Sequence, residues 1–296
     1  MIFSQSCYNG CNRLSAIAPF FLVVGFLISA DLFANNPSPS RKITFAVECF
    51  KKDQMDAGIT WVKMALEESK STKDYRKWAF KLSDYSAEAA AMCGEKAYAA
   101  GQKDIALTSS LAKWYRLSDN CQKAISLYSI LISCDTMRAD FFAERAECYA
   151  NHAAEEEASF ALALKDYEKA FSLNPHINRF YGRAIAKWKL GDLPGATTDL
   201  QRSITLNLEA GSCYNVLGLI SHQSGDYDKA IMCFTKALDI DHNDSIAIFN
   251  RAKSHFENGS SEEACKDITE SQRLFPDLYD QELIEETFPE LHCGSK

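Results

Sequence analysis

The stretch SGDYDKAIMCFTKALDI, residues 224–240, contains the signals of a turn and of the helix that follows it. Gly225 suits the end of a preceding helix, and the aspartate after it is a residue type that commonly begins a new helix. From Ala230 onward, apolar residues recur three and four positions apart, which is the spacing of one helical face. Residues 189–196 (KLGDLPGA) and 258–264 (NGSSEEA) show the same order of glycine, helix-starting polar residue and alanine. The stretch therefore predicts two helices joined by a tight turn, as a unit that recurs.

Small residues recur along the chain with a period of about 34 residues. The series expected in the second helix of each unit is Ala90, Ala124, Ala163, Ala196, Ala230 and Ala264. The series expected in the first helix is Ala112, Ala146, Ala184, Gly218 and Ala252. Two independent series that share one period are hard to obtain by chance. Because a single helix pair cannot bury its apolar face alone, we expect the pairs to stack on one another.

This pattern resembles the tetratricopeptide repeat, a family with small residues where two helices cross, glycine at the turn and often proline at the end. Pro175 and Pro276 stand at the expected end of two repeats. The resemblance implies an all-α fold, a right-handed superhelical solenoid of stacked helix-turn-helix repeats. The predicted repeats are a degenerate one at 71–104, followed by 105–138, 139–176, 177–210, 211–244 and 245–278. Residues 35–70 are expected to form a linker and an N-terminal capping helix, and residues 279–296 a C-terminal capping segment.

The repeat at 139–176 departs from the pattern, because it has five additional residues between Tyr149 and Ala163. No glycine or proline interrupts this stretch, and two interpretations stay open. Both helices run about one turn longer and project as a docking surface, or the addition is a tolerated insertion in an exposed turn.

Residues 1–34 differ in composition from the rest of the chain. A single arginine precedes an uncharged apolar run at 16–30, and a polar segment follows Ala34. This order is typical of an export signal, with cleavage near Ala30 or Ala34. The run contains a proline and is shorter than the roughly 20 apolar residues of a membrane-spanning helix. The leading interpretation is a cleaved signal and a periplasmic, secreted or secretory-pathway protein. An uncleaved membrane anchor at 16–30 is the alternative.

Nine cysteines follow residue 34, and this odd number leaves at least one unpaired. None forms a CxxC pair or a Cys/His cluster with the spacing of a zinc site. We expect most of them to be small buried apolar residues, and the sequence assigns no disulfide. The expected compartment therefore depends on the N-terminal segment alone.

The composition gives no indication of catalysis or of nucleic-acid binding. The chain of 296 residues has 32 Lys and Arg against 40 Asp and Glu, a net charge of −8, and no basic stripe. Phosphate backbones are bound by such stripes, so nucleic acid is not an expected partner. The six histidines lack the spacing of metal ligands on one helical face, and no phosphate-binding glycine loop or nucleophile motif is present. We expect no catalytic residue, no metal site and no cofactor.

The resemblance also implies a binding surface, because the first helices of such repeats line the concave side of the stack. Aromatic and aliphatic residues with a few polar groups fall at the groove-facing positions, a composition that peptide-binding surfaces use. The predicted partner-binding residues are Tyr181, Ile185, Trp188, Asn215, Leu219, His222, Phe249, Lys253 and Phe256. The alternative is that some of them pack on neighbouring helices or under the C-terminal segment.

The leading functional hypothesis is a non-catalytic scaffold or adaptor that binds a peptide or helix of another protein in this groove. A second hypothesis is a permanent structural subunit of a larger assembly, whose solenoid packs against one partner. An enzyme of unrecognised type is the third, and no convergent polar constellation supports it.

Chaperone-binding members of the family hold a C-terminal carboxylate with lysine and asparagine side chains at set positions of the first helices. This chain has Tyr181 and Ile185 at two such positions, and only Asn250 matches. The C-terminal tails of the Hsp70 and Hsp90 chaperones are therefore not expected as partners. Arg–Ala pairs that are similar to those domains are expected to support the fold and not a clamp; they stand at 145–146, 183–184 and 251–252.

Overall fold

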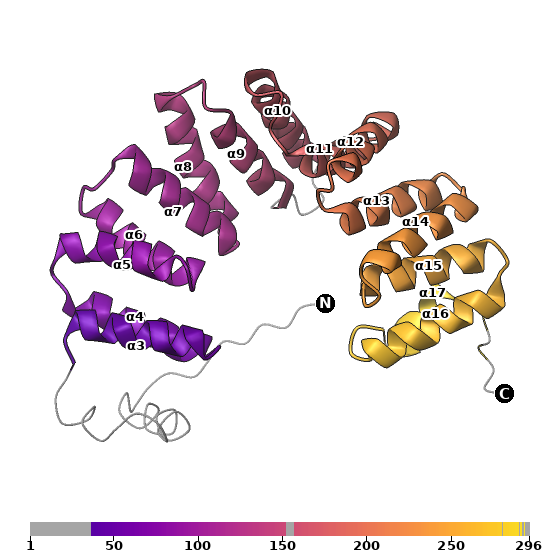
Figure 1. Cartoon of the computed structure of the whole chain (residues 1–296), viewed down its shortest axis with the longest axis horizontal. Coiled ribbons are helices and arrows are strands. Elements are labelled where there is room, and N and C mark those ends of the chain that lie inside the picture. The colour runs from indigo at the N-terminus through magenta and orange to yellow at the C-terminus, as the bar shows by residue number, and fades with distance from the viewer. Residues whose placement is uncertain (1–36, 152–156, 280, 290, 292, 294–296) are drawn as a thin grey trace. The chain divides into compact units, whose positions relative to one another are not determined.

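The computed structural model describes residues 37–151, 157–279, 281–289, 291 and 293, and these residues form α-helices joined by short turns (Figure 1). The all-α prediction is confirmed for this part of the chain, which contains no strand. The export signal or anchor predicted at 1–34 lies outside the described residues. The chain divides into two compact units, one up to Gly101 and one from Gln102, and each is described by itself.

The first unit contains two helix pairs. Its helices are α3 (Pro39–Lys51), α4 (Met55–Glu68), α5 (Thr72–Leu82) and α6 (Ala87–Ala99). α3 packs on α4 and α5 on α6, while α3 also contacts α5 and α4 contacts α6. The sequence predicts a linker and one capping helix at 35–70, and the structure instead has the complete pair α3–α4 there.

Small residues explain this additional pair. Ala46, Gly58 and Ala65 have the same spacing as the small residues of the later repeats, and Ala46 and Ala65 are fully buried. The ring of Phe50 lies so close to Gly58 that an added Cβ would come within 2.2 Å of it. The turn between the helices uses Asp53 at a φ of +59°, where the later repeats have glycine. Aspartate adopts this left-handed conformation more readily than most residues, but it does not mark a turn in a sequence as glycine does.

One turn position recurs through both units at the end of a first helix. In five of the described first helices, the backbone takes a positive φ seven residues after the small residue. The residues at this position are Asp53, Asp119, Gly191, Gly225 and Gly259. The repeated turn reverses the chain so that each second helix returns along the first.

The second unit continues with helix pairs from residue 102 onward. The first helices are α7 (Ile105–Leu117), α9 (Ala139–Asn151), α11 (Phe180–Lys189), α13 (Ala210–Gln223) and α15 (Ser245–Glu257). The second helices are α8 (Cys121–Cys134), α10 (Glu157–Leu173), α12 (Leu193–Thr205), α14 (Tyr227–Ile240) and α16 (Ser261–Leu274), and the short α17 (Gln281–Thr287) comes after them. From α7 to α16, each helix packs on its neighbours in sequence, and α9, α11, α13 and α15 also contact one another in order. The first helices therefore lie side by side.

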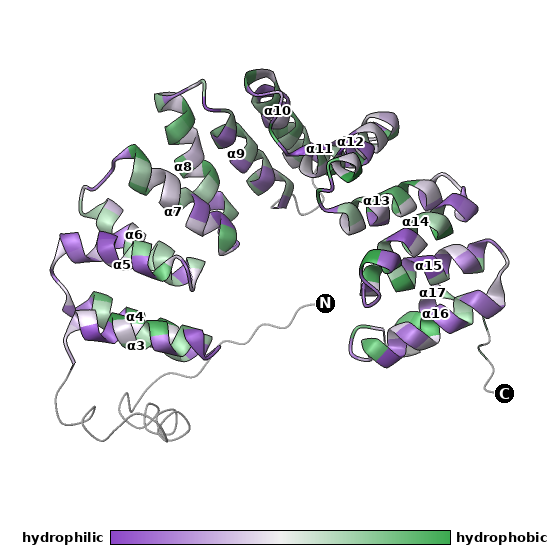
Figure 2. Ribbon diagram, in the orientation of Figure 1, coloured by the Kyte–Doolittle hydropathy of each residue, from purple (hydrophilic) through white to green (hydrophobic). Residues whose placement is uncertain are grey.

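Small residues allow the two helices of a pair to cross closely. Ala184 and Ala196 are fully buried between α11 and α12. In the next pair, a Cβ on Gly218 would lie 2.6 Å from the ring of Phe234. Hydrophobic and hydrophilic residues alternate along the helices, as Figure 2 shows, so each helix has a face for packing and a face for solvent.

The repeat with additional residues has a long second helix. α10 spans 17 residues, about one turn more than the 14 residues of α8 or α14. α9 extends to Asn151, and residues 152–156 lie outside the described part of the chain.

Buried ion pairs join the two helices in three of the repeats. Each arginine places its guanidinium against a largely buried aspartate with two hydrogen bonds of 2.6–2.9 Å. The pairs are Arg145–Asp166, Arg183–Asp199 and Arg251–Asp267. Between the last two, Leu217 and Cys233 stand at the equivalent positions and belong to the apolar core. The arginines of the three Arg–Ala pairs thus contact their own repeats, as expected from the sequence.

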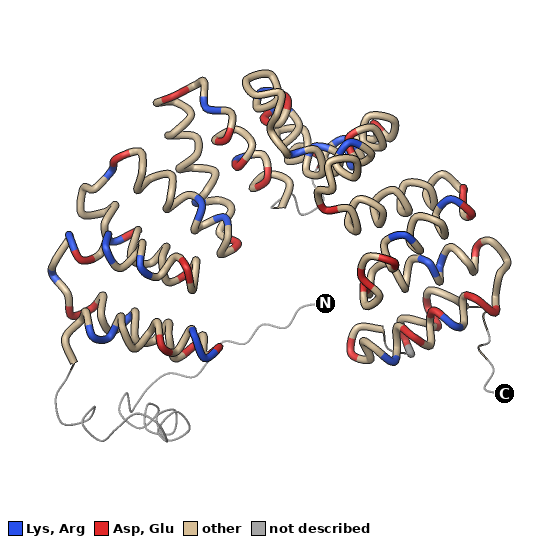
Figure 3. Tube along the Cα trace, viewed as in Figure 1, with Lys and Arg blue, Asp and Glu red and all other residues tan. Residues whose placement is uncertain are grey.

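Charged residues of both signs are interspersed along the helices (Figure 3). Among the described residues, no helix is both long enough and apolar enough to cross a membrane.

Candidate functional site

The predicted groove residues of α11 are half-buried and contribute to the packing of α11 on α13. Tyr181, Ile185 and Trp188 lie against an apolar cluster that includes Leu200 and Val216. The indole Nε1 of Trp188 donates a hydrogen bond of 3.1 Å to Oε1 of Gln223 at the end of α13. Part of the surface of each of these three side chains therefore packs against the core, and the other part is exposed.

The predicted polar residues of α13 bind α15. Nδ2 of the buried Asn215 donates a 2.6 Å hydrogen bond to Asp244, which caps the start of α15. Nδ1 of His222 lies 3.0 Å from Oγ of Ser254. Burial, and then the charge of Lys253, lowers the pKa of His222. Leu219, between the two polar residues, is half-buried.

The predicted aromatic residues of α15 are covered by the C-terminal segment of the same chain. Phe249 stacks on Tyr279 with ring centres 4.7 Å apart, and it meets the edge of Phe288 at 5.8 Å. Phe256 also contacts Phe288, at 5.5 Å between ring centres. The structure therefore agrees, for Phe249 and Phe256, with the alternative that they pack under the C-terminal segment. This segment covers part of their apolar surface.

A disulfide fixes this C-terminal cover. Cys265 on α16 is bonded to Cys293, and their Cα atoms are 5.3 Å apart. Tyr279, Ile284 and Phe288, which lie between the two cysteines in the sequence, are buried. The odd cysteine count indicates only that some cysteines are unpaired, and sequence spacing alone does not identify this pair.

A network of two arginines and two glutamates lies between the first helices at the other end of this unit. Arg116 of α7 contacts Glu144 at 2.6 Å and Glu147 at 3.1 Å, both on α9. Arg179, which precedes α11, contacts the same glutamates at 2.9 and 3.0 Å. We call these four residues the Arg–Glu network. It joins three consecutive repeats and balances its own charge.

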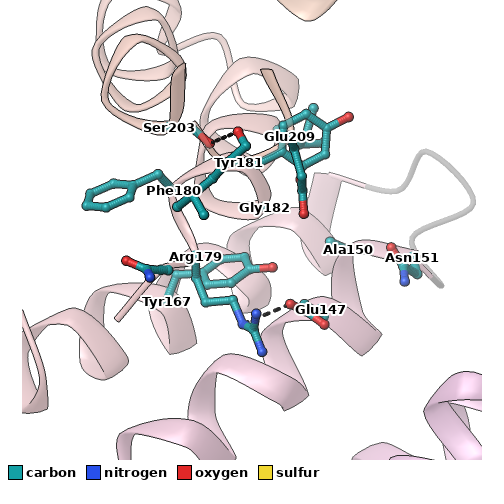
Figure 4. Close-up of a pocket in the computed structure, with 13 residues that line it drawn as sticks. Glu147, Ala150, Asn151, Tyr167, Arg179, Phe180, Tyr181, Gly182, Ser203 and Glu209 are labelled. Carbon is teal, nitrogen blue, oxygen red and sulfur yellow. Dashed lines mark hydrogen bonds and ion pairs between the residues drawn. The ribbon is translucent and has the colours of Figure 1, made fainter. Parts of the chain in front are cut away.

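A pocket of about 270 Å³, which we call the α9–α11 pocket, opens beside this network (Figure 4). Glu147 and Arg179 form one side of it, and Phe180, Tyr181 and Glu209 contribute from α11 and the start of α13. The complete lining is Glu147, Ala150, Asn151, Tyr167, Asn178, Arg179, Phe180, Tyr181, Gly182, Ile185, Ser203, Leu208 and Glu209. Of the predicted groove residues, Tyr181 and Ile185 belong to it.

The Tyr167 hydroxyl at this pocket has no hydrogen-bond partner among the described residues, although the side chain is fully buried. Burial raises the pKa of Tyr167, so the hydroxyl keeps its proton. A Cβ on Gly182 would lie 2.2 Å from this oxygen, which shows how closely α11 approaches it. A buried polar group without a partner costs about 1–3 kcal/mol. A ligand that donates a hydrogen bond to this hydroxyl would remove that cost.

Glu209 stands at the rim of the same pocket in an unusual conformation. Its φ of +50° and ψ of +38° are left-handed, and it directly precedes α13 without a capping hydrogen bond. The side chain is exposed and has no ion-pair partner within the described chain. Strained residues of this kind cluster at functional sites. Neither Glu209 nor Tyr167 was identified from the sequence as a site residue, because no motif marks them.

The described residues contain no group of three or more His, Cys, Asp or Glu side chains that could hold a metal ion. The α9–α11 pocket has donors and acceptors for hydrogen bonds and ion pairs.

Comparison with known proteins is consistent with this architecture. The family model for the tetratricopeptide repeat matches residues 212–244, which include most of α13 and all of α14. The chain contains a tetratricopeptide repeat. The family resemblance seen in the sequence is thereby confirmed.

One relative is anaphase-promoting complex subunit 3 of Schizosaccharomyces pombe, 26% identical over 127 residues. The match covers 43% of this chain and 19% of that relative, so the matched part spans about a fifth of the relative's length.

Three solved structures have the same fold. A tetratricopeptide-repeat protein from Parabacteroides merdae has a TM-score of 0.58 at 15% identity, covering 85% of this chain and 97% of that one. PilW, a type IV pilus biogenesis factor, has a TM-score of 0.58 at 16% identity, covering 73% and 97%. The Cut9–Hcn1 hetero-tetramer has a TM-score of 0.57 at 13% identity, covering 84% and 52%. At these identities the similarity shows the fold alone.

Proposed function

We propose that this protein is a non-catalytic scaffold that binds an extended or helical segment of another protein along α9, α11 and α13. The observation that carries this proposal is the α9–α11 pocket, which is open and contains a buried hydroxyl without a partner. Peptide-binding surfaces place half-exposed aromatic side chains around such pockets, and Phe180 and Tyr181 have that position here.

The proposal shifts the binding surface away from α15. Phe249 and Phe256 already pack against Tyr279 and Phe288, so a partner would have to displace the C-terminal segment to reach the surface that these contacts cover. Tyr181 and Ile185 keep exposed surface and line the α9–α11 pocket. The proposed binding region is therefore the one between α9 and α13, where the α9–α11 pocket lies.

A selection with a random library of displayed 12-residue peptides tests this function on the full-length protein. We expect enriched peptides whose affinity falls about tenfold or more when Tyr181→Ala removes a ring at the pocket. Met232→Ala is the matched control, because Met232 is an exposed apolar residue of α14, a second helix. If no peptide is enriched, or if both variants weaken binding equally, the proposed function is wrong.

A permanent subunit is the second candidate. The relative from Schizosaccharomyces pombe is a subunit of a complex, and Cut9–Hcn1 is a hetero-tetramer. This candidate requires that the protein, purified from its source under native conditions, elutes with a stoichiometric partner even at high dilution. A protein that elutes alone would favour the reversible scaffold.

We also propose that the protein is exported, with residues 1–34 removed. The Cys265–Cys293 disulfide supports this, because disulfides persist mainly in oxidising compartments. N-terminal sequencing of the mature protein should then begin between Asp31 and Ser38. A soluble cytosolic species that retains Met1 would contradict export, and a membrane-bound species that retains it would indicate the uncleaved anchor.

A further inference from the structure

The α9–α11 pocket has an excess of negative charge. Within the Arg–Glu network, two arginines face two glutamates, and every one of the four has opposite charges beside it. Glu209 adds a further negative charge at the rim, so the charged lining residues are Glu147 and Glu209 against Arg179 alone. The pocket is therefore one positive charge short of balance.

The two carboxylates are close enough to influence each other. Burial is the main cause that raises the pKa of Glu147, and the negative charges of Glu144 and Glu209 raise it further. Arg179 and Arg116 oppose this effect, but each of them is shared with Glu144. A cation placed near Glu147 and Glu209 would relieve the remaining repulsion.

An anionic ligand does not fit this site. Arg179 is the pocket's one arginine or lysine among the lining residues, and its guanidinium already contacts both Glu144 and Glu147. A carboxylate or phosphate would have to compete with these contacts while approaching the free charge of Glu209. Like charges that lose water in this way are strongly disfavoured.

The rest of the lining suits a long side chain with an aliphatic stem. Tyr181 and Ile185 offer apolar surface along the wall. Tyr167 adds a hydroxyl oxygen that can accept a hydrogen bond from an N–H group, and the backbone of Gly182 packs directly against this oxygen. Lysine and arginine bury their stems along apolar surface and present only donors at their ends.

We propose that the α9–α11 pocket receives a lysine or arginine side chain of the bound segment, with Glu209 and Glu147 as its counter-charges and the Tyr167 hydroxyl as an acceptor. This inference rests on the proposed scaffold function and specifies the partner: the segment carries a basic residue at the position that enters the pocket.

The direct test uses single-residue probes with the full-length protein. Nα-acetyl-lysine N-methylamide and Nα-acetyl-arginine N-methylamide are titrated by NMR, with the glutamine and norleucine analogues as uncharged controls. We expect saturable binding of the two cationic probes, weakened several-fold as added salt shortens the screening length from ~14 to ~4 Å. Equal binding of the norleucine analogue would overturn the proposal.

Variants identify the groups involved. Glu209→Gln should weaken binding of the cationic probes by about fivefold or more, since a charge-assisted contact becomes a neutral one. Glu168→Gln is the matched control, because Glu168 is an exposed glutamate of α10 outside the pocket. Tyr167→Phe should weaken probe binding without lowering the melting temperature, since the lost hydroxyl has no partner among the described residues. Equal effects of Glu209→Gln and Glu168→Gln would show that only overall charge matters, which contradicts the proposal.

The peptide selection separates this inference from the proposed function. Peptides that require Tyr181 but tolerate replacement of every Lys and Arg would leave the scaffold standing and overturn the basic-residue pocket. Cationic probes that bind through Glu209, in the absence of any selected peptide, would support the pocket and overturn the scaffold.

Discussion

The first helices present two different surfaces in the second unit, one around α9 and α11 and the other on α15. On α15, Phe249 and Phe256 form an aromatic surface that the chain covers with its own Tyr279 and Phe288. Around α9 and α11, the Arg–Glu network holds the helices together and the pocket beside it is open. Aromatic residues at groove-facing positions therefore do not by themselves mark a binding site. Near a chain end they serve equally well as a core for the terminal segment.

Removing the cover should have the largest effect. Phe288 is 2% exposed and contacts both Phe249 and Phe256, so Phe288→Ala should cost about 3–5 kcal/mol in the free energy of unfolding. Urea denaturation followed by far-ultraviolet circular dichroism measures this. Leu278→Ala is the control in the same segment, because Leu278 is 56% exposed. Similar small effects of both variants would mean that the C-terminal segment does not cover α15.

Opening the disulfide should have the next largest effect. Cys293→Ser removes a cross-link between positions 28 residues apart and should lower the free energy of unfolding by about 2–4 kcal/mol. Hydrogen exchange should increase in α15 and α17 and stay unchanged in α9 and α11. Cys134→Ser, at an exposed free cysteine, should change neither quantity. Faster exchange in α9 would show that the two surfaces are not independent.

Breaking the Arg–Glu network should destabilise the other surface by a smaller amount. Arg179→Ala removes contacts to Glu144 and Glu147 and should cost about 1–2 kcal/mol, since water partly screens the pair. Arg273→Ala breaks an exposed pair with Glu270 within one helix and should leave thermal unfolding unchanged. If Arg179→Ala were equally silent, the network would not hold α9 and α11 together.

Removing either of two tyrosine hydroxyls should have the smallest effect on the free energy of unfolding. The hydroxyl of Tyr279 donates a 2.9 Å hydrogen bond to the carbonyl of Ser245 at the start of α15, whereas that of Tyr167 has no partner among the described residues. Tyr279→Phe should lower the free energy of unfolding by about 1 kcal/mol, and Tyr167→Phe should leave it unchanged or raise it. Equal losses in thermal unfolding would show that Tyr167 has a structural partner and that its hydroxyl is not reserved for a ligand.

The sequence is sufficient to predict the helix pairs because their signal is local and repeated. Ala184, Ala196 and Gly218 are small for one physical reason, the close crossing of two helices, and this reason recurs in every repeat. The pair α3–α4 escapes prediction because Asp53 makes a turn that elsewhere uses glycine. Because aspartate also adopts the left-handed conformation, a turn of this kind can form without the glycine that would mark it in the sequence.

The candidate site is less predictable because it depends on contacts between repeats. Tyr181 and Ile185 are identified from their positions on a first helix, and both line the pocket. Glu209 and Tyr167 come from a connection and from a second helix, and only the packed structure brings them to the same cavity. The covering of Phe249 by Tyr279 is likewise a tertiary contact between segments without a shared pattern.

The cover on α15 also bears on how the second unit comes apart. Its helices contact mainly their neighbours in sequence, so it behaves as a one-dimensional array in which opening starts at an end and travels inward. At the C-terminal end, α17 and the bond between Cys265 and Cys293 hold the last helix pair closed. The terminal repeat is ordinarily the least stable part of such an array. Here the cover and the disulfide suppress opening from that end.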